Sequence, residues 1–305
     1  MLVFGPVPSR RLGRSLGINN IPYKVCTYAC TYCQIGRTLR MSVERRMFYD
    51  PEKIYREVER RVGEELDYIT MVPDGEPTLD LNLGKLAKML EDFSYPLAIL
   101  TNSSLIWRED VQEDLLNFDY ISFKVDAVSE EFWRRVDRPH KSLRIEEILQ
   151  GLVDFRKKFN GKIVTETMLI SGLDYSEELE KIGSFLKTLN PDIAYIAIPT
   201  RPPAEPWVKP ASEEVVAEAY HIFSSNVDRV EYLIGYEGSE FAATGDFEED
   251  ILSITSVHPM REDAVIHLMA KDGASGEVLE KLLREEKIKR IEFQRHVYYV
   301  RRFNG

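Results

Sequence analysis

Short apolar stretches alternate with longer amphipathic stretches along most of the chain. The short stretches are rich in β-branched and aromatic residues, as strands are, and lie at residues 67–72, 97–102, 120–127, 162–170 and 193–199, with residues 229–235 as one further candidate. The longer stretches repeat their apolar residues at helical spacing and lie at residues 51–62, 83–93, 109–117, 130–136, 145–159, 176–189 and 213–224. The repeating unit of this sequence is therefore a strand followed by a helix.

Repeated strand–helix units predict a parallel sheet covered by helices. Six units, counted from a strand ahead of residue 25, predict an α/β fold, an open (β/α)6 partial TIM barrel. In barrels of this kind, functional groups gather at the carboxyl ends of the strands. Residues 5–24 are rich in Gly and Pro, and we expect them to form a loop whose arginines, Arg10, Arg11 and Arg14, either meet an anionic group or are solvated.

The pattern changes at about Phe247, where three short amphipathic stretches begin. Residues 287–303 follow and read as two short strands with a tight connection at about Gln294 and Arg295. Three helices and a hairpin are typical of a winged helix. We therefore predict two domains, a barrel at residues 1–245 and a small winged-helix-like domain at residues 246–305.

The composition is that of a globular protein with a real core, because 44% of the 305 residues are hydrophobic and 30% are charged. The net charge of −11 argues against broad, non-specific binding to nucleic acid or to an anionic membrane, although a local basic site remains compatible with it. The N-terminal stretch lacks the long apolar run of a signal peptide, and no stretch approaches the roughly 18 apolar residues of a membrane span. We expect a cytoplasmic protein in a reducing compartment.

The C-terminal segment 287–305 departs from the acidic character of the rest, with six basic residues and one acidic residue. Its basic side chains lie beside Phe293, Tyr298 and Tyr299, so the segment could contact RNA phosphates or a peptide. The alternative is that this hairpin packs on the barrel, with its aromatic rings inside and its arginines solvated.

All three cysteines of the chain, Cys26, Cys30 and Cys33, fall within eight positions. An odd number of thiols in a reducing compartment fits disulfides poorly. A structural zinc site needs a fourth ligand, and the nearest histidine in the sequence is His140. A [4Fe–4S] cluster on three thiolates is the third possibility, and it leaves one iron open to a ligand that is not protein.

The spacing C-x3-C-x2-C, with Tyr32 before the last cysteine, resembles the signature of the radical S-adenosylmethionine (radical SAM) superfamily. The resemblance implies a [4Fe–4S] cluster on Cys26, Cys30 and Cys33, with the amino and carboxylate groups of SAM on the open iron. A reductant such as ferredoxin or flavodoxin would then drive cleavage of SAM to a 5′-deoxyadenosyl radical that abstracts hydrogen from a substrate. Tyr32 either packs near the adenine or shields the cluster from water.

Two segments that follow predicted strands extend the resemblance. Asp74-Gly75-Glu76-Pro77 resembles the Gly-Gly-Glu-Pro segment that holds the amino group of SAM, with Asp74 in place of the first Gly. The alternative is an ordinary Gly-Pro turn. Asn102, after the next strand, lies in a Thr-Asn-Ser segment that resembles the family's Thr-Asn-Gly.

Later strands supply further candidate cofactor-binding residues. Lys124 and Asp126 match positions that contact the ribose or carboxylate of SAM, although an ion pair at the barrel edge explains them equally well. Thr167 lies on a strand with a mixed polar face. Pro199 and Arg201 follow the sixth strand, where family members line the adenine, and Arg201 is either directed at an anionic group or exposed at the surface.

These segments together resemble the stand-alone iron–sulfur oxidoreductases that are loosely related to wyosine-type tRNA-modifying enzymes. The wyosine enzymes carry a second set of cluster-binding cysteines, which this chain lacks, so their chemistry is not carried over. We therefore expect a radical SAM enzyme that acts on an unidentified substrate, either RNA or a protein or peptide. An iron–sulfur redox-sensing DNA-binding regulator is the alternative from another class, but such a sensor has no need of Gly75 and Glu76.

Overall fold

A computed structural model describes residues 2–63, 65–235, 238, 241 and 243–302. Its main sheet has eight strands in the order β1-β2-β5-β6-β7-β8-β9-β10. They are β1 (Val3–Ser9), β2 (Gly13–Ile18), β5 (Tyr68–Met71), β6 (Leu97–Thr101), β7 (Tyr120–Lys124), β8 (Lys162–Met168), β9 (Ile193–Ala197) and β10 (Val230–Leu233). All neighbouring pairs from β2 to β10 are parallel, and β1 pairs antiparallel with β2. The predicted α/β fold with a mostly parallel sheet is confirmed, and β10 adds one strand beyond the six units.

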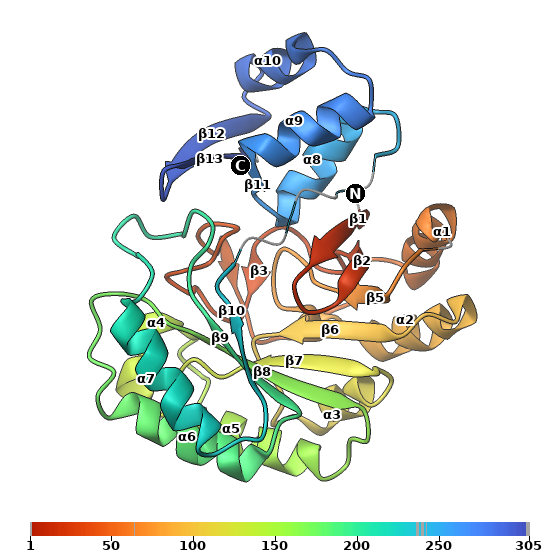
Figure 1. Ribbon diagram of the computed structural model, residues 1–305. Coiled ribbons are helices and arrows are strands. Elements are labelled where there is room, and N and C mark those ends of the chain that lie inside the picture. The colour runs from red at the N-terminus through yellow and green to blue at the C-terminus, as the bar shows by residue number, and fades with distance from the viewer. Residues whose placement is uncertain (1, 64, 236–237, 239–240, 242, 303–305) are drawn as a thin grey trace.

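Helices cover the outer face of this sheet, and the sheet curves as in a partial barrel (Figure 1). They are α1 (Pro51–Arg61), α2 (Leu83–Leu90), α3 (Glu109–Leu115), α4 (Glu130–Val136), α5 (Ile145–Arg156), α6 (Glu178–Leu189) and α7 (Glu213–Ser224), with short 3-10 turns at Pro77–Leu79 and Glu91–Phe93. Asp50 caps α1 by accepting a hydrogen bond from the amide of Glu52, and Pro51 occupies the first turn. Within the described residues, no helix combines the length and apolarity needed to cross a membrane.

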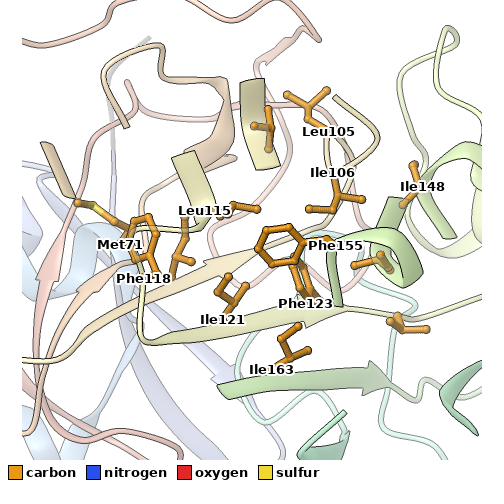
Figure 2. Close-up of a cluster of buried hydrophobic side chains, with 14 of the residues drawn as sticks. Met71, Leu105, Ile106, Leu115, Phe118, Ile121, Phe123, Ile148, Phe155 and Ile163 are labelled. Atoms are coloured by element: carbon orange, nitrogen blue, oxygen red, sulfur yellow. The ribbon is translucent and has the colours of Figure 1, made fainter. Parts of the chain in front are cut away.

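The apolar core between sheet and helices explains why the strands read as apolar runs. Phe123 of β7 meets Phe155 of α5 edge-to-face, with ring centroids 5.9 Å apart, and Ile121 and Ile163 pack beside them (Figure 2). Burying each such side chain stabilises the fold by about 1.5–3 kcal/mol. This layer holds the carboxyl ends of the parallel strands in place, where the candidate site lies.

The expectation that residues 5–24 form a loop is wrong for residues 5–18, which belong to the β1–β2 hairpin, whereas residues 19–24 contain no strand or helix. The strand expected ahead of residue 25 is β2. β1 carries two prolines, but it is an edge strand, where missing amide donors are tolerated. The register with β2 shifts between Phe4 and Val7, and Gly5 and Pro6 lie in this irregularity. Gly17 has to be glycine, because a Cβ there would stand 2.1 Å from the ring of Phe4.

The C-terminal residues form a separate group of elements with their own three-stranded sheet, in the order β11-β13-β12. The elements are α8 (Phe247–Val257), β11 (Met260–Arg261), α9 (Glu262–Lys271), α10 (Gly276–Arg284), β12 (Ile288–Phe293) and β13 (His296–Arg301). The three predicted helices and the hairpin are confirmed, and Gln294 and Arg295 adopt the left-handed backbone of a two-residue turn. The sequence missed β11, because two residues are too few for a pattern. The predicted second strand also included Phe303, which lies outside the described residues.

This C-terminal unit, residues 246–302, is docked on the barrel. Its core of buried apolar residues continues into Phe4 and Val7 of β1. On another side, Tyr298 donates a hydrogen bond to the main-chain oxygen of Thr200 at 2.8 Å. Figure 1 shows the unit over the end of the sheet that carries β1 and β2. The N-terminal hairpin therefore belongs to the cores of both parts.

Candidate functional site

The three cysteines lie on one loop that begins at β3 (Val25–Cys26), a short strand paired with β4 (Arg40–Met41). All three thiols are free and their residues are partly exposed. The main chain of the loop is tightly turned, since the amide of Cys33 donates to the carbonyl of Cys30 at 3.2 Å and Gly36 donates to Cys33 at 3.1 Å. The three thiols therefore share one loop, as the sequence predicts.

The cysteine loop is anchored to the segment that follows α4. The amide of Ala29 donates to the carbonyl of Asp137 at 3.0 Å, and that of Thr31 donates to Val136 at 2.9 Å. His140 joins the loop only through its main chain, which donates to Thr27 at 2.9 Å, while its imidazole Nδ1 is bonded to the hydroxyl of Ser142 at 2.8 Å. His140 is the histidine nearest to the cysteines in the sequence. Its imidazole is bonded to Ser142 and does not complete a zinc site with the thiols.

Burial and neighbouring charges set the protonation of the thiols. Burial, and secondly the carboxylate of Glu76, raise the pKa of Cys26 to about 12. Burial and then Asp137 raise the pKa of Cys30 well above its usual value. The raised pKa values favour the thiol form of Cys26 and Cys30, and a metal centre that binds these residues would displace their protons.

Lys24 supplies the cation of this loop, and the sequence analysis did not single it out. Its ammonium donates to the sulfur of Cys33 at 3.2 Å, although the residue is only 2% exposed. Burial lowers the pKa of Lys24, but the thiols of Cys33 and Cys26 outweigh this and raise it above its ordinary value. The signal in the sequence was a lysine two positions before Cys26.

Gly75 and Glu76 lie directly beneath the cysteine loop. A Cβ on Gly75 would stand 1.9 Å from the main-chain oxygen of Val25, so only glycine fits between the two segments. The amide of Glu76 donates to that same oxygen at 3.2 Å. Pro77 opens the 3-10 turn that follows, and its carbonyl accepts from Asn20 at 3.2 Å.

The Glu76 carboxylate is buried and held by several donors. Its Oε1 accepts from the amide of Thr78 at 3.1 Å, from the hydroxyl of Thr78 at 2.7 Å and from the hydroxyl of Thr101 at 2.6 Å, while Oε2 accepts from the amide of Asn102 at 2.8 Å. Burial raises the pKa of Glu76, and these hydrogen bonds counteract that rise. The carboxylate is thus fixed in one orientation beside Cys26.

Asn102 connects the carboxylate to the cysteine loop, because its side-chain amide donates to the hydroxyl of Thr27 at 2.7 Å and lies 3.6 Å from the sulfur of Cys26. The predicted residues Gly75, Glu76 and Asn102 are therefore brought together with the thiols. Asp74 stands where the resembling Gly-Gly-Glu-Pro segment has its first Gly. Its carboxylate is turned away from the thiols and accepts a hydrogen bond from the side-chain amide of Asn19 at 2.7 Å.

Tyr32 and Asp126 form a second polar group on the other side of the loop. The hydroxyl of Tyr32 donates to Asp126 and lies 3.3 Å from a carboxylate oxygen of Asp137. The ammonium of Lys124 stands 5.0 Å from the centre of the Tyr32 ring, in cation–π range. Burial, and after it the nearby Asp126, raise the pKa of Asp137 well above its usual value. No motif in the sequence indicated Asp137.

Lys124 also forms an ion pair, which is mostly buried inside the barrel and not solvated at its edge. Its ammonium lies 2.5 Å from Oε1 of Glu166, and the other oxygen of Glu166 is paired with Arg11. Thr167 lies on the opposite side of the same strand, where its hydroxyl donates to the main-chain oxygen of Val125 at 2.8 Å. The structure therefore separates Thr167 from the predicted site and places Glu166 there instead.

Pro199 and Arg201 lie where the loop after β9 meets the C-terminal unit. The carbonyl of Pro199 accepts from the side chain of Gln294 at 2.9 Å. The guanidinium of Arg201 donates to Oε1 of Gln34, the residue after Cys33, at 2.5 Å and lies 3.2 Å from Nε2 of His258. Arg201 is thus beside the cysteine loop, whereas Pro199 serves the contact between the two parts of the chain.

The three thiols suit a cluster better than a single ion. The loop supplies three sulfur ligands, those of Cys26, Cys30 and Cys33. A structural zinc needs four ligands around one point, whereas in a cubane cluster each thiolate binds a different iron. The chemistry of the donor set therefore fits a [4Fe–4S] cluster with one iron that this loop does not ligate.

A family model described as the radical SAM superfamily matches residues 20–186 of the chain. This segment includes the three cysteines, Glu76 and Asn102. The match spans more than half of the chain and covers the loop and strand ends described above.

Two curated relatives match over most of their length. UPF0026 protein MJ1312 of Methanocaldococcus jannaschii is 49% identical over 307 residues, which cover 98% of this chain and 96% of that protein. UPF0026 protein slr1464 of Synechocystis is 33% identical over 229 residues, which cover 74% of this chain and 84% of that protein. Among solved structures, Streptococcus suis SuiB bound to S-adenosylmethionine matches with a TM-score of 0.54 at 13% identity. That match covers 70% of this chain but only 49% of SuiB, and at such identity it shows the fold alone.

Proposed function

The chain belongs to the radical SAM superfamily, whose members use a [4Fe–4S] cluster and S-adenosylmethionine, and we propose that Cys26, Cys30 and Cys33 ligate the cluster in this protein. Membership implies an enzyme. The observation that carries the proposal is that three free thiols share one turned loop, which Asn102 ties to the buried carboxylate of Glu76. Together the reduced cluster and SAM supply abstraction of a hydrogen atom from an unreactive C–H bond.

Glu76 and Asn102 are the residues we assign to the amino group of SAM. Oε2 of Glu76 carries fewer of the observed hydrogen bonds than Oε1, so it has capacity for an ammonium donor. The hydrogen bonds from Thr78 and Thr101 orient the carboxylate before any ligand arrives. Such preorganisation lowers the cost of binding.

Tyr32, Lys124 and Asp126 form the opposite wall, and we assign them to the carboxylate and adenosyl parts of SAM. The Lys124 ammonium is held between Glu166 and the Tyr32 ring, which keeps a cation at this wall. The aromatic face of Tyr32 offers a surface on which a purine can stack. An external one-electron donor such as ferredoxin or flavodoxin completes the reaction in this proposal.

We propose further that residues 246–305 form a winged-helix-like domain and residues 1–245 the barrel domain. The order helix, strand, two helices, two strands and the sheet order β11-β13-β12 support this assignment. The wing, β12 and β13, lies against the loop after β9 through Tyr298 and Gln294. The domain therefore covers part of the barrel mouth.

The basic residues of the wing motivated RNA as a substrate, but several of them are neutralised locally. Arg290 pairs with Glu262 at 3.2 Å, and Lys287 pairs with Glu248 at 2.8 Å. Tyr298 and Tyr299 are buried. Paired charges and buried rings favour packing of the wing on the barrel over contact with RNA phosphates. We therefore propose that the substrate binds at the barrel mouth and not on the wing.

Anaerobic reconstitution with iron, sulfide and a strong reductant tests the function. We expect close to four irons and four sulfides per chain, loss of both in Cys30→Ala, and formation of 5′-deoxyadenosine once SAM is added. Zinc without acid-labile sulfide would refute the cluster, and a loaded cluster that never cleaves SAM with any reductant would refute the enzymatic proposal. Glu76→Gln should retain the iron and weaken SAM binding, because one charge-assisted hydrogen bond is lost.

A further inference from the structure

Two basic segments accompany the cysteine loop in a chain whose net charge is −11. Residues 34–46 carry four arginines and one glutamate. Residues 134–144 carry four arginines, one lysine and one aspartate, which is the buried Asp137. None of these basic residues is assigned above to the cluster or to SAM, so their concentration here calls for another partner.

Both segments pack on the start of the cysteine loop. The hydroxyl of Thr38 donates to the carbonyl of Tyr28 at 2.7 Å, and Tyr28 also forms a β-bridge with Pro139. Met41 pairs with Cys26 in the ladder between β3 and β4. The two segments, about a hundred residues apart in the sequence, therefore meet at the loop that carries the thiols.

Glu205 joins the two segments through their guanidiniums. Its Oε2 accepts from Arg37 at 3.1 Å, and its Oε1 accepts from Arg138 at 2.7 Å. The side chain of Glu205 is only 11% exposed, whereas those of Arg37 and Arg138 are 72% and 43% exposed. One carboxylate thus holds two guanidiniums at the surface, and this group keeps a net positive charge.

Arg40 adds a further cation beside this group. Its side chain is exposed, and within the described residues it forms no ion pair. Glu44, the acidic residue of the first segment, is already paired with Arg46. We call the surface made by these cations and their apolar neighbours the loop face, and it consists of Arg37, Leu39, Arg40, Met41 and Arg138.

The apolar members of the loop face are exposed among the cations. Leu39 is 69% exposed and Met41 is 37% exposed. The face extends into a cleft of about 530 Å³ between the cysteine loop and β12, whose described lining includes Arg37, Leu39 and Lys289 and no acidic side chain. Exposed apolar side chains with a polar, charged rim are typical of a surface that contacts another protein.

The composition of the loop face favours an acidic protein over a nucleic acid. Neither basic segment contains Phe, Tyr or Trp, the residues on which single-stranded bases stack. A phosphate backbone would also leave the side chains of Leu39 and Met41 without an apolar partner. An acidic protein with a small apolar contact suits both the charges and the apolar side chains.

We propose that the loop face docks an acidic one-electron carrier protein, the reductant of the cluster. This inference rests on the proposed function and names the surface through which its electron arrives. One electron passes from the reduced carrier to the cluster, and no bond forms or breaks in this step. Because Met41 pairs with Cys26, a carrier on the loop face is only one strand away from a cluster-binding residue.

The charge distribution of the whole chain also directs an acidic carrier to this face. A chain with a net charge of −11 repels an acidic protein from most of its surface, whereas the loop face attracts it. Contacts between electron-transfer partners are small and short-lived, so a few exposed charges are sufficient to select the docking surface.

Calorimetric titration of the full chain, with and without reconstituted cluster, tests the docking. The probes are an oxidised bacterial flavodoxin, an oxidised plant-type ferredoxin and a short single-stranded RNA. We expect saturable binding of at least one carrier, which weakens as salt is added and is at least about tenfold weaker in Arg37→Gln/Arg40→Gln. The matched control is Arg56→Gln/Arg60→Gln, which removes two positive charges from the exposed face of α1 and should bind like the wild type.

Cleavage of SAM provides a second measurement. Dithionite is a small reductant that needs no docking surface, so with it the wild type and Arg37→Gln/Arg40→Gln should form 5′-deoxyadenosine at the same rate. With the reduced carrier as the electron source, this variant should be at least about fivefold slower at low ionic strength, because steering depends on these charges.

Three outcomes would overturn the proposal. Neither carrier binds the wild type, or the carrier binds Arg37→Gln/Arg40→Gln as tightly as it binds the α1 variant, or the RNA binds in a way that depends on Arg37 and Arg40. The third outcome would favour a nucleic-acid partner for the loop face. Failure to load iron, or to cleave SAM with dithionite, would instead refute the proposed function, so the two failures are distinguishable.

Discussion

Gly75 lies so close to the main chain of Val25 that a Cβ added to it would stand 1.9 Å from the Val25 oxygen. This contact joins the loop that carries Glu76 to the strand that carries Cys26. The fit between these two segments, and not the turn propensity of glycine alone, explains the residue at position 75. The φ angle of Gly75 lies outside the left-handed range, so glycine is required here because a side chain has no room, and not because of the backbone conformation.

Gly75→Ala should push the two segments apart and destabilise the fold by about 1–3 kcal/mol, the usual cost of overpacking. Because the displaced strand carries Cys26, iron content after reconstitution should fall as well. The matched control is Gly276→Ala, where a Cβ meets open space. Equal melting temperatures and equal iron content in the two variants would show that the contact at Gly75 is not restrictive.

Arg45→Met tests the support beneath the Glu76 turn. The Arg45 side chain is 3% exposed, donates to the carbonyls of Thr78 and Asp80 at 2.9 and 2.8 Å, and pairs with Asp110 and Asp114. Removing it leaves a partly buried carboxylate without its partner, so we expect a loss of about 3–5 kcal/mol.

Arg46→Met is the matched control for that measurement, because the neighbouring Arg46 pairs with Glu44 at the exposed surface. Such exposed pairs contribute at most about 1 kcal/mol. Urea unfolding of both variants gives the comparison. Similar midpoints for the two variants would contradict the role assigned to Arg45.

Asp74→Asn should alter the pH dependence of stability. Burial raises the pKa of Asp74 from 3.8 to about 7, so the folded chain keeps a proton that the unfolded chain has already lost in this window. The contribution of Asp74 to the free energy of unfolding is therefore complete below pH 4. It falls by about 4 kcal/mol as the pH rises to 7. The variant should gain stability relative to the wild type as the pH rises from 4.5 to 7.5, as measured by urea unfolding. Asp228→Asn, at an exposed turn, should show no such trend.

Lys24→Met should make the bound cluster harder to reduce. The ammonium lies 3.2 Å from the sulfur of Cys33, and a nearby positive charge favours the more negative, reduced cluster. We expect the midpoint potential to fall by at least about 60 mV, a tenfold change in a one-electron equilibrium. Redox titration followed by electron paramagnetic resonance measures it, and Lys53→Met on the exposed face of α1 is the control. An unchanged potential would show that solvent, not Lys24, balances the cluster charge.

Tyr298→Phe should loosen the docking of the C-terminal unit on the barrel. The variant loses the hydrogen bond to the carbonyl of Thr200, a contribution of about 1 kcal/mol, and leaves that carbonyl unsatisfied. Hydrogen exchange at residues 198–202 and in β13 should quicken, whereas Tyr220→Phe on the exposed face of α7 should leave it unchanged. Equal protection in both variants would mean that the core shared with Phe4 and Val7 is sufficient for docking.

The sequence by itself determined the alternation of strands and helices, since apolar periodicity directly reports which faces are buried. It also determined that Cys26, Cys30 and Cys33 share one loop, and it placed Gly75, Glu76 and Asn102 at the ends of strands. These features are local or follow from the rule that parallel strands end together. The β1 strand of the N-terminal hairpin was not predicted, because its glycine and prolines are typical of a loop. It forms as an edge strand between β2 and the C-terminal core.

Only the tertiary structure decided which distant charges meet. Asp137 beside Tyr32, and Arg11, Arg201 and His258 around one cavity, come from separate segments, and no spacing along the chain encodes their proximity. Thr167 shows the reverse case, because the pleat of β8 turns it away from Glu166. Side-chain direction within a strand depends on register, and register is set by the neighbouring strands once they pack.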